Sequence, residues 1–263
     1  TEEPLLLIGP HGTGKSLLLT RIAEALGLAF RHYNSSLLNF DDLVGFPLPN
    51  KNGSLEYVKT PAAIWGAEAV IFDEISRCRP DIQNKLFPII HERRAQGIRL
   101  NGLRYRWAAM NPPMSEDYDE SYLGSEPLDP ALADRFAFVV NMPSWDRYSE
   151  DEQLAIILAD DSAVAAGSAA KLQSAVAATE AALSSVRETI GNGVAVYVRT
   201  LVALLARAGI SVSPRRAGMF QRSVLAVHAA ALTFDGDANP SDSALLAVRN
   251  GLPQIAEGRS IPE

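Results

Sequence analysis

The chain has 263 residues, of which 21% are charged and 47% apolar, and its formal net charge is −7. This composition is typical of a globular protein with a substantial core, and the negative charge disfavours a general role in coating nucleic acid. The single cysteine excludes an internal disulfide framework, and the sequence has no run of 18 apolar residues that predicts a membrane span. We therefore expect a protein of the cytoplasm.

Short apolar runs alternate with helical patterns through the first half of the chain. The alternation predicts a parallel sheet of about five strands, covered by helices on both faces. The dipeptide Asn101-Gly102 predicts a hairpin between residues 98–100 and 103–105. Pro88 predicts a kink in the second helix. The expected strands are 5–8, 29–33, 70–72, 105–110 and 136–140, and the expected helices are 16–26 and 80–93. Because the first strand stands almost at the start, we expect further residues upstream.

The second half has a different composition. From about residue 146, alanine, leucine and valine dominate and strand patterns fade. A capping box at 149–152 and the pair Ser213-Pro214 mark two helix starts. We expect helices near 149–159, 169–190, 194–208, 214–233 and 241–250. The sequence thus predicts an α/β domain over 1–145, followed by an all-helical lid domain over 146–263.

Residues 9–16 have the sequence Gly-Pro-His-Gly-Thr-Gly-Lys-Ser, which fits the phosphate-loop pattern G-x-x-x-x-G-K-[ST]. It lies between an expected strand and an expected helix, which is the context that this motif requires. Lys15 is expected to reach the β- and γ-phosphates of a nucleotide, and the Ser16 hydroxyl to bind Mg²⁺. Backbone N–H groups are expected to converge on phosphate oxygens at Gly9, Gly12, Thr13, Gly14 and Leu17.

Two carboxylates follow the apolar strand 70–72. Asp73 can hold Mg²⁺ directly or through water, and Glu74 can orient and deprotonate an attacking water. Beside a phosphate loop, this pair predicts hydrolysis of ATP. Guanine specificity is not indicated, because the N-K-x-D pattern is missing.

The ordered motifs resemble the MoxR group of AAA+ ATPases, which carries an insertion in its second helix. The segments 41–45 and 53–57 resemble that insertion, and 73–77 resembles the acidic motif of the group. Three more segments match functional positions of the family: 109–112 its sensor-1 site, 132–136 its arginine-finger segment and 213–215 the start of its sensor-2 helix.

This resemblance implies residue roles and an assembly. Asn111 would help to position the lytic water, and Arg135 would be the arginine finger. Arg215 would sense the nucleotide, with its neighbour Arg216 as the alternative. The family forms rings, often hexamers, with ATP between neighbouring subunits. Its members are chaperone-like remodelling ATPases, and they often act with a partner that carries a von Willebrand factor A domain and on a client protein.

Three other functions stay open on the sequence. The chain could be the ATPase subunit of a metal-insertion chelatase, which is a relative with the same insertion. It could also be a nucleotide-dependent assembly switch, which would share the whole site. A nucleic-acid motor is disfavoured by the negative charge, although Arg93, Arg94, Arg99, Arg104 and Arg106 cluster around the expected hairpin.

Overall fold

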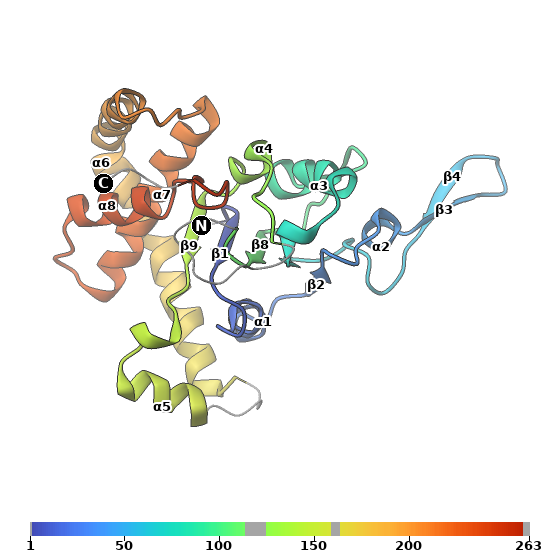
Figure 1. Cartoon of the computed structure of the whole chain (residues 1–263), viewed down its shortest axis with the longest axis horizontal. Helices are drawn as coiled ribbons and strands as arrows, with labels where there is room; N and C mark the ends of the chain where they lie inside the picture. Colours follow the sequence, from blue (N-terminus) through green and yellow to red (C-terminus); the bar gives the residue numbers. More distant parts are fainter. Residues whose placement is uncertain (1, 114–124, 159–163, 260–263) are drawn as a thin grey trace.

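A computed structural model describes residues 2–113, 125–158 and 164–259. Its centre is a five-stranded sheet in the order β2-β5-β8-β1-β9, in which all neighbouring strands are parallel (Figure 1). The expected α/β core is confirmed. The five strands are β1 (Leu5–Ile8), β2 (Phe30–Asn34), β5 (Ala69–Asp73), β8 (Tyr105–Met110) and β9 (Phe138–Asn141).

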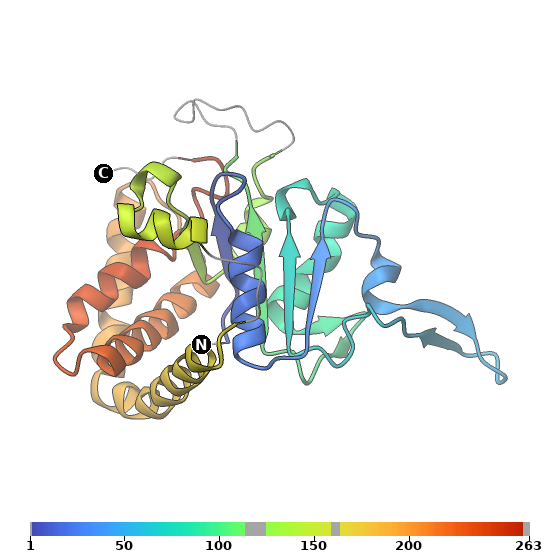
Figure 2. The same cartoon turned by 90° about the horizontal axis from the view of Figure 1, so that it is seen from below.

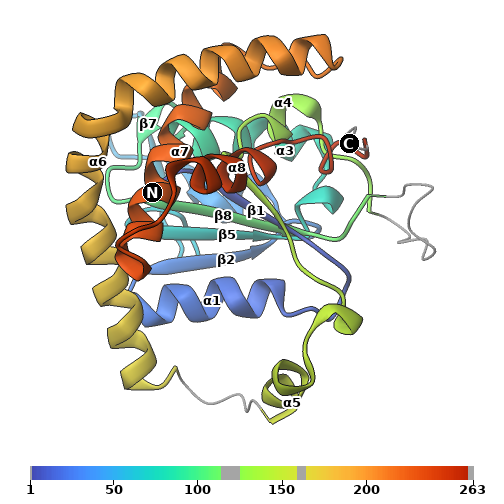
Figure 3. The ribbon, with the colours of Figure 1, turned by 90° about the vertical axis from the view of Figure 1, so that its left-hand side faces the viewer.

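Helices cover both faces of this sheet, because its central strands β5, β8 and β1 bury side chains on both sides. Helix α1 (Lys15–Ala25) lies on one face, and α3 (Pro80–Phe87) and α4 (Pro130–Ala133) lie on the other (Figure 3). In β1, Leu7 packs in the cluster under α1, whereas Leu6 packs in the cluster under α3. Helix α3 ends before Pro88, where the kink was expected, and the chain continues as a π-helical turn, Pro88–Glu92.

A hairpin extends from the core next to the short helix α2 (Phe40–Val44) (Figure 2). It consists of β3 (Phe46–Pro49) and β4 (Leu55–Val58), paired antiparallel. Gly45 joins α2 to this hairpin at φ 91°, and a Cβ at this position would lie 2.3 Å from the Val58 carbonyl oxygen. Only glycine fits there without distortion. The segment that resembles the helix-two insertion is therefore a projecting β-ribbon.

The prediction of a hairpin at Asn101-Gly102 is wrong. The structure has a smaller hairpin, β6 (Arg94–Ala95) and β7 (Ile98–Arg99), which turns at Gln96-Gly97. Both turn residues have positive φ, 50° and 76°, as a tight two-residue hairpin turn requires. Asn101-Gly102 instead occupies a turn closed by the Leu103 N–H on the Leu100 carbonyl, which leads into β8.

After β9, the regular elements of the described chain are helices. The expected pair 169–190 and 194–208 is one uninterrupted helix, α6, with 42 residues. Gly191 and Gly193 lie at the expected break, but a helical glycine costs only about 1 kcal/mol. Helix α6 packs along α7, and this packing outweighs that cost. The helices are α5 (Glu150–Leu158), α6 (Ala166–Arg207), α7 (Pro214–Phe234) and α8 (Pro240–Arg249), after the short 3₁₀ turn Trp145–Arg147.

Both predicted helix starts are confirmed by their caps. The Ser149 N–H donates to the Glu152 carboxylate while the Ser149 hydroxyl accepts from the Glu152 N–H, and Ser213 accepts from the Arg216 N–H. By length and composition alone, α6 could also cross a membrane, and 17% of its most apolar window is buried. That criterion by itself does not separate a membrane span from a long helix of a globular protein.

Candidate functional site

The phosphate loop leaves a concave row of backbone groups between β1 and α1. Gly12 and Gly14 have φ of 77° and 75°, and nothing lies within 4 Å of where a Cβ would stand on either. Helix α1 begins with Gly14 as its N-cap, without a side-chain cap and without an acidic residue in its first turn. Its first N–H groups are therefore free to bind an anion, favoured by the helix dipole.

Lys15 joins this loop to the sensor-1 position. Its Nζ donates to the carbonyls of Gly9 at 2.8 Å and Pro10 at 2.7 Å, and to Asn111 Oδ1 at 3.1 Å. Burial lowers the pKa of Lys15, while Asp73 and Glu74 act in the opposite direction. The cation is thus held between the loop and two carboxylates, where the negative charge of a phosphate would replace its contacts to carbonyl oxygens.

The sheet order explains how these groups meet. β5, β8 and β1 are neighbours, and Asp73, Asn111 and the phosphate loop stand at their carboxyl ends. The N–H of Gly9 donates to the Met110 carbonyl, which fixes the start of the loop beside Asn111. The three predicted motifs, far apart in sequence, form one site at this edge.

Asp73 is held as a carboxylate. Burial alone would raise its pKa, but hydrogen bonds from His32, Ser16 and the Glu74 N–H outweigh burial and lower the pKa. His32 Nε2 lies 3.6 Å from Asp73 Oδ2. The sequence analysis gave His32 no role in the site. The pairing of β2 with β5 could have suggested one, since His32 lies on β2 near the end where β5 presents Asp73.

Glu74 has a left-handed backbone conformation, with φ 50° and ψ 42°. This region is unfavourable for a residue other than glycine, and strain of this kind is concentrated at functional sites. The carboxylate stays partly exposed, with Arg77 Nη1 at 3.8 Å from Glu74 Oε2. The conformation turns Glu74 away from the line of β5 while its charge still acts on Lys15.

Arg135 and Arg215 are not brought to this edge. Arg135 follows α4 and precedes β9. Two and three residues further on, the N–H groups of Ala137 and Phe138 donate to the Pro4 carbonyl, just before β1. Pro4 precedes Gly9 by five residues, so this corner is separated from the phosphate loop by roughly 15 Å of strand. Arg215 Nη1 lies at the same corner, 3.1 Å from Asp134 Oδ2.

Arg216 has a different environment from Arg215. Its side chain is buried and donates to the carbonyls of Ala133 at 3.0 Å and Gly251 at 2.8 Å, and to that of Phe136. Asp134 also accepts from it. Arg216 therefore joins α7 to the corner before β9, and only Arg215 of the two presents an exposed guanidinium.

The residues at the carboxyl edge of the sheet fit a nucleoside triphosphate with a hard divalent cation. An open row of N–H groups, a buried ammonium, and the hydroxyl of Ser16 hydrogen-bonded to an ionised Asp73 are the groups that phosphates and Mg²⁺ require. Thr13 instead donates its hydroxyl to the Pro10 carbonyl and closes the loop, and Leu17 stands in the first turn of α1 with an exposed side chain.

Comparison with known families agrees with this geometry. Residues 4–136 match the model of the AAA domain of the dynein-related subfamily. The chain belongs to this AAA family. Nucleotide binding and membership of the AAA+ ATPases follow from that assignment, and the helical region after the α/β core fits the lid of such proteins.

Two further comparisons bear on this AAA protein. The solved structure of a predicted ATPase from Cytophaga hutchinsonii ATCC 33406 is similar to it, with a TM-score of 0.59 and 21% sequence identity, over 96% of this chain and 77% of the other. At that identity the likeness concerns the fold. A search of curated proteins found no match.

Proposed function

We propose that this AAA protein hydrolyses ATP with Mg²⁺ between the subunits of a homo-oligomeric ring. One observation carries the proposal: the groups that such a reaction needs are divided between two ends of the sheet. Lys15, Ser16, Asp73, Glu74 and Asn111 stand at the carboxyl edge, whereas Arg135 and Arg215 stand at the corner before β9. A second subunit would bring the two sets together.

Within one subunit, the first set supplies everything except a cation over the outermost phosphate. Ser16 and Asp73 would hold Mg²⁺, which neutralises charge on the β- and γ-phosphates. Glu74 would accept a proton from the attacking water, and Asn111 would orient that water by hydrogen bonding. Lys15 would move from the loop carbonyls to the phosphates.

The second set, Arg135 and Arg215, has the properties of an anion-binding site. Burial and the nearby Arg215 lower the pKa of Arg135, so two like charges stand close together. Within residues 2–113, 125–158 and 164–259, Arg135 forms no ion pair; its guanidinium stacks 4.2 Å from the Phe87 ring. Asp134 accepts hydrogen bonds from Ser213, Arg215 and Arg216. The phosphates of a neighbouring subunit would supply the missing negative charge.

Mixing two inactive variants tests this arrangement. Arg135→Ala and Glu74→Gln should each turn over ATP very slowly, because arginine fingers contribute roughly 10³–10⁵ in rate and general bases about 10²–10⁴. In mixed rings, some interfaces combine an intact Glu74 with an intact Arg135. Steady-state phosphate release should therefore rise above that of either variant alone, and specific activity of the wild type should rise with protein concentration.

Arg135→Lys is the matched control, since it keeps the positive charge but not the planar guanidinium. Mixed with Glu74→Gln, it should restore less activity than the wild-type protein mixed with Glu74→Gln. Full activity of Arg135→Ala, or of a protein shown to be monomeric by light scattering, would refute action across an interface. The same mixing with Arg215→Ala tests whether the second arginine also acts on the neighbour.

We further propose that the ring is a hexamer of the MoxR kind, located in the cytoplasm, which remodels or activates a client protein together with a von Willebrand factor A partner. The resemblance of the motifs and the projecting β3–β4 ribbon support this reading. Light scattering with and without ATP, and turnover measured with and without such a partner, test it. A monomer under every nucleotide condition would overturn the ring.

A further inference from the structure

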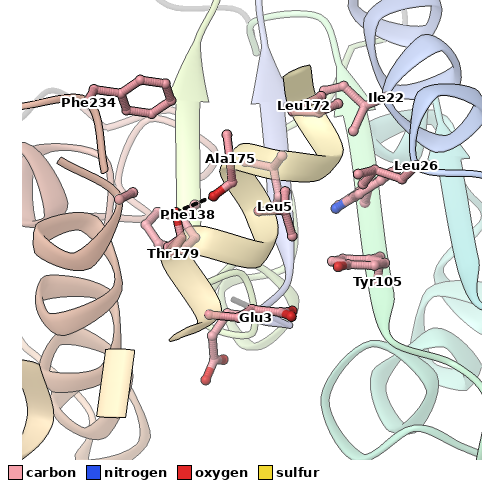
Figure 4. A pocket seen from close by; sticks show the side chains of 14 residues that line it. Glu3, Leu5, Ile22, Leu26, Tyr105, Phe138, Leu172, Ala175, Thr179 and Phe234 are labelled. Atoms are coloured by element: carbon pink, nitrogen blue, oxygen red, sulfur yellow. Dashed lines mark hydrogen bonds between the residues drawn. The ribbon is translucent and has the colours of Figure 1, made fainter. Parts of the chain in front are cut away.

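A second cavity lies between the α/β core and the long helix, away from the phosphate loop. It has a volume of about 400 Å³. Figure 4 shows its walls: the start of β1, the last turn of α1 and β8 on one side, and α6 and the end of α7 on the other. Gln173 of α6 donates to the carbonyl of Ala25 at 2.7 Å and ties these two walls together. The cavity is thus bounded by both parts of the protein.

The walls are predominantly apolar and aromatic. Leucine, isoleucine and valine side chains alternate with four aromatic rings, and Ala175 and Ala230 leave the space open on the helical side. Tyr105 and Trp107 form an aromatic pair with centroids 5.2 Å apart. The aromatic residues are Tyr105, Trp107, Phe138 and Phe234. Pockets of this size and composition are typical of small-molecule sites.

The polar groups of the lining define the charge that the cavity accepts. No lysine, arginine or histidine is among the described residues that line it, whereas Glu3 and Glu180 are. These carboxylates pair with arginines outside the lining, Glu3 with Arg222 and Glu180 with Arg104. An anionic ligand would find no cation in the described lining, because the two arginines that pair with these carboxylates lie outside it.

Among the described lining residues, two polar groups are left for a ligand, the Tyr105 hydroxyl and the indole N–H of Trp107. The Thr179 hydroxyl donates to the Ala175 carbonyl at 2.8 Å and contacts Thr233. The Tyr105 hydroxyl, by contrast, makes no hydrogen bond within the described ranges, and it points toward the middle of the pocket (Figure 4). A partly buried phenol of this kind gains from a ligand that offers one hydrogen-bonding atom.

We propose that this cavity binds an uncharged, largely apolar small molecule of two or three rings, or of similar volume, with a single hydrogen-bonding group directed at Tyr105. The size favours this occupant over a protein segment, because a helix with its side chains is about 10–12 Å across and one side chain would leave most of the space empty. A ligand there touches the sheet, α1, α6 and α7 at once, so it stabilises one arrangement of the helical region on the core.

Two matched fluorescent probes test the inference on the full chain. N-phenyl-1-naphthylamine is uncharged and has one N–H group; 1-anilinonaphthalene-8-sulfonate is the same molecule with a sulfonate. The uncharged probe should bind one per chain with a Kd on the order of 10–100 µM. The sulfonate should bind at least tenfold more weakly. Equal affinity of the two probes, or several probes per chain, would overturn the proposed chemistry.

Variants locate the site. Ala175→Phe and Ala230→Phe fill the cavity from two different helices, and each should weaken the uncharged probe at least tenfold. Ala177→Phe is the matched control, because Ala177 is exposed on α6 and does not line the cavity. Tyr105→Phe keeps the ring and should weaken binding about three- to tenfold. Circular dichroism confirms folding of each variant.

If binding survives both filling variants in folded protein, the probe binds elsewhere and the proposal is wrong. If the affinity falls only at protein concentrations where the chain self-associates, a second copy occupies the cavity instead, which also overturns it. None of these measurements depends on ATP hydrolysis, so failure here is separate from failure of the interface mechanism.

Discussion

The two adjacent arginines at the start of α7 should respond very differently to the same substitution. Arg216 is 1% exposed and donates to three backbone carbonyls and to Asp134. Arg216→Met removes all four hydrogen bonds while keeping much of the apolar stem. Arg215→Met, one residue earlier, removes a single ion pair whose arginine is 36% exposed.

The expected magnitudes follow from burial. Removing one partner of a buried ion pair costs about 3–5 kcal/mol, and we take the lower end because the Asp134 side chain is 20% exposed. The carbonyls of Ala133, Phe136 and Gly251 would lose a partner as well, so about 3 kcal/mol is a minimum. At about 2–4 °C per kcal/mol for a chain of this size, Tm should fall by roughly 6–12 °C. Arg215→Met loses an exposed pair, about 0.2–1 kcal/mol, or roughly 0.4–4 °C.

Thermal unfolding by circular dichroism at pH 7, with urea midpoints as a second measure, provides the comparison. A fluorescent ATP analogue should meanwhile show an effect of Arg215→Met only in the assembled protein. The reasoning would be refuted if both variants had the same Tm within error, or if Arg215→Met were the less stable. Either result would mean that Arg216 does not join the helical region to the core.

Three further results are expected. Lys15→Ala should lose nucleotide binding in a fluorescence titration while its circular dichroism spectrum stays unchanged, because the hydrogen bonds of Nζ go only to loop carbonyls and Asn111. Normal nucleotide affinity in a folded variant would contradict the phosphate-loop assignment. Burial raises the pKa of the Cys78 thiol to about 11. Iodoacetamide should therefore label Cys78 about 100-fold more slowly at pH 8 than an ordinary thiol of pKa 9, and the labelling rate should rise tenfold per pH unit up to pH 10. Fast labelling of the folded protein at pH 8 would show that the thiol is accessible and contradict this expectation. Gly45→Ala should make the β3–β4 ribbon more susceptible to limited proteolysis without changing nucleotide affinity, and an equal cleavage rate in both proteins would show that the backbone adjusts around the Val58 carbonyl.

The elements that depend on local pattern could be predicted from the sequence. The strand before residue 9 and the helix after it follow from apolar runs and from glycine chemistry, and the caps at Ser149 and Ser213 follow from side chains within three residues. Where two local signals competed, the prediction was wrong. Asn101-Gly102 is a strong turn signal, but the hairpin forms at Gln96-Gly97, where strand pairing of Ala95 with Ile98 is satisfied.

The sequence by itself determined the chemistry of the phosphate loop and the acidic pair, because those motifs fix backbone shape and charge within a few residues. Only the tertiary structure decided how they are grouped. Strand order placed β8 between β5 and β1, which brings Asn111 to Lys15, and the pairing of β2 with β5 brings His32 to Asp73. The same packing buried Arg216 and left Arg215 beside Arg135, at the corner away from the phosphate loop. Contacts between residues distant in the chain depend on the register of strands and the docking of helices, which no local pattern encodes.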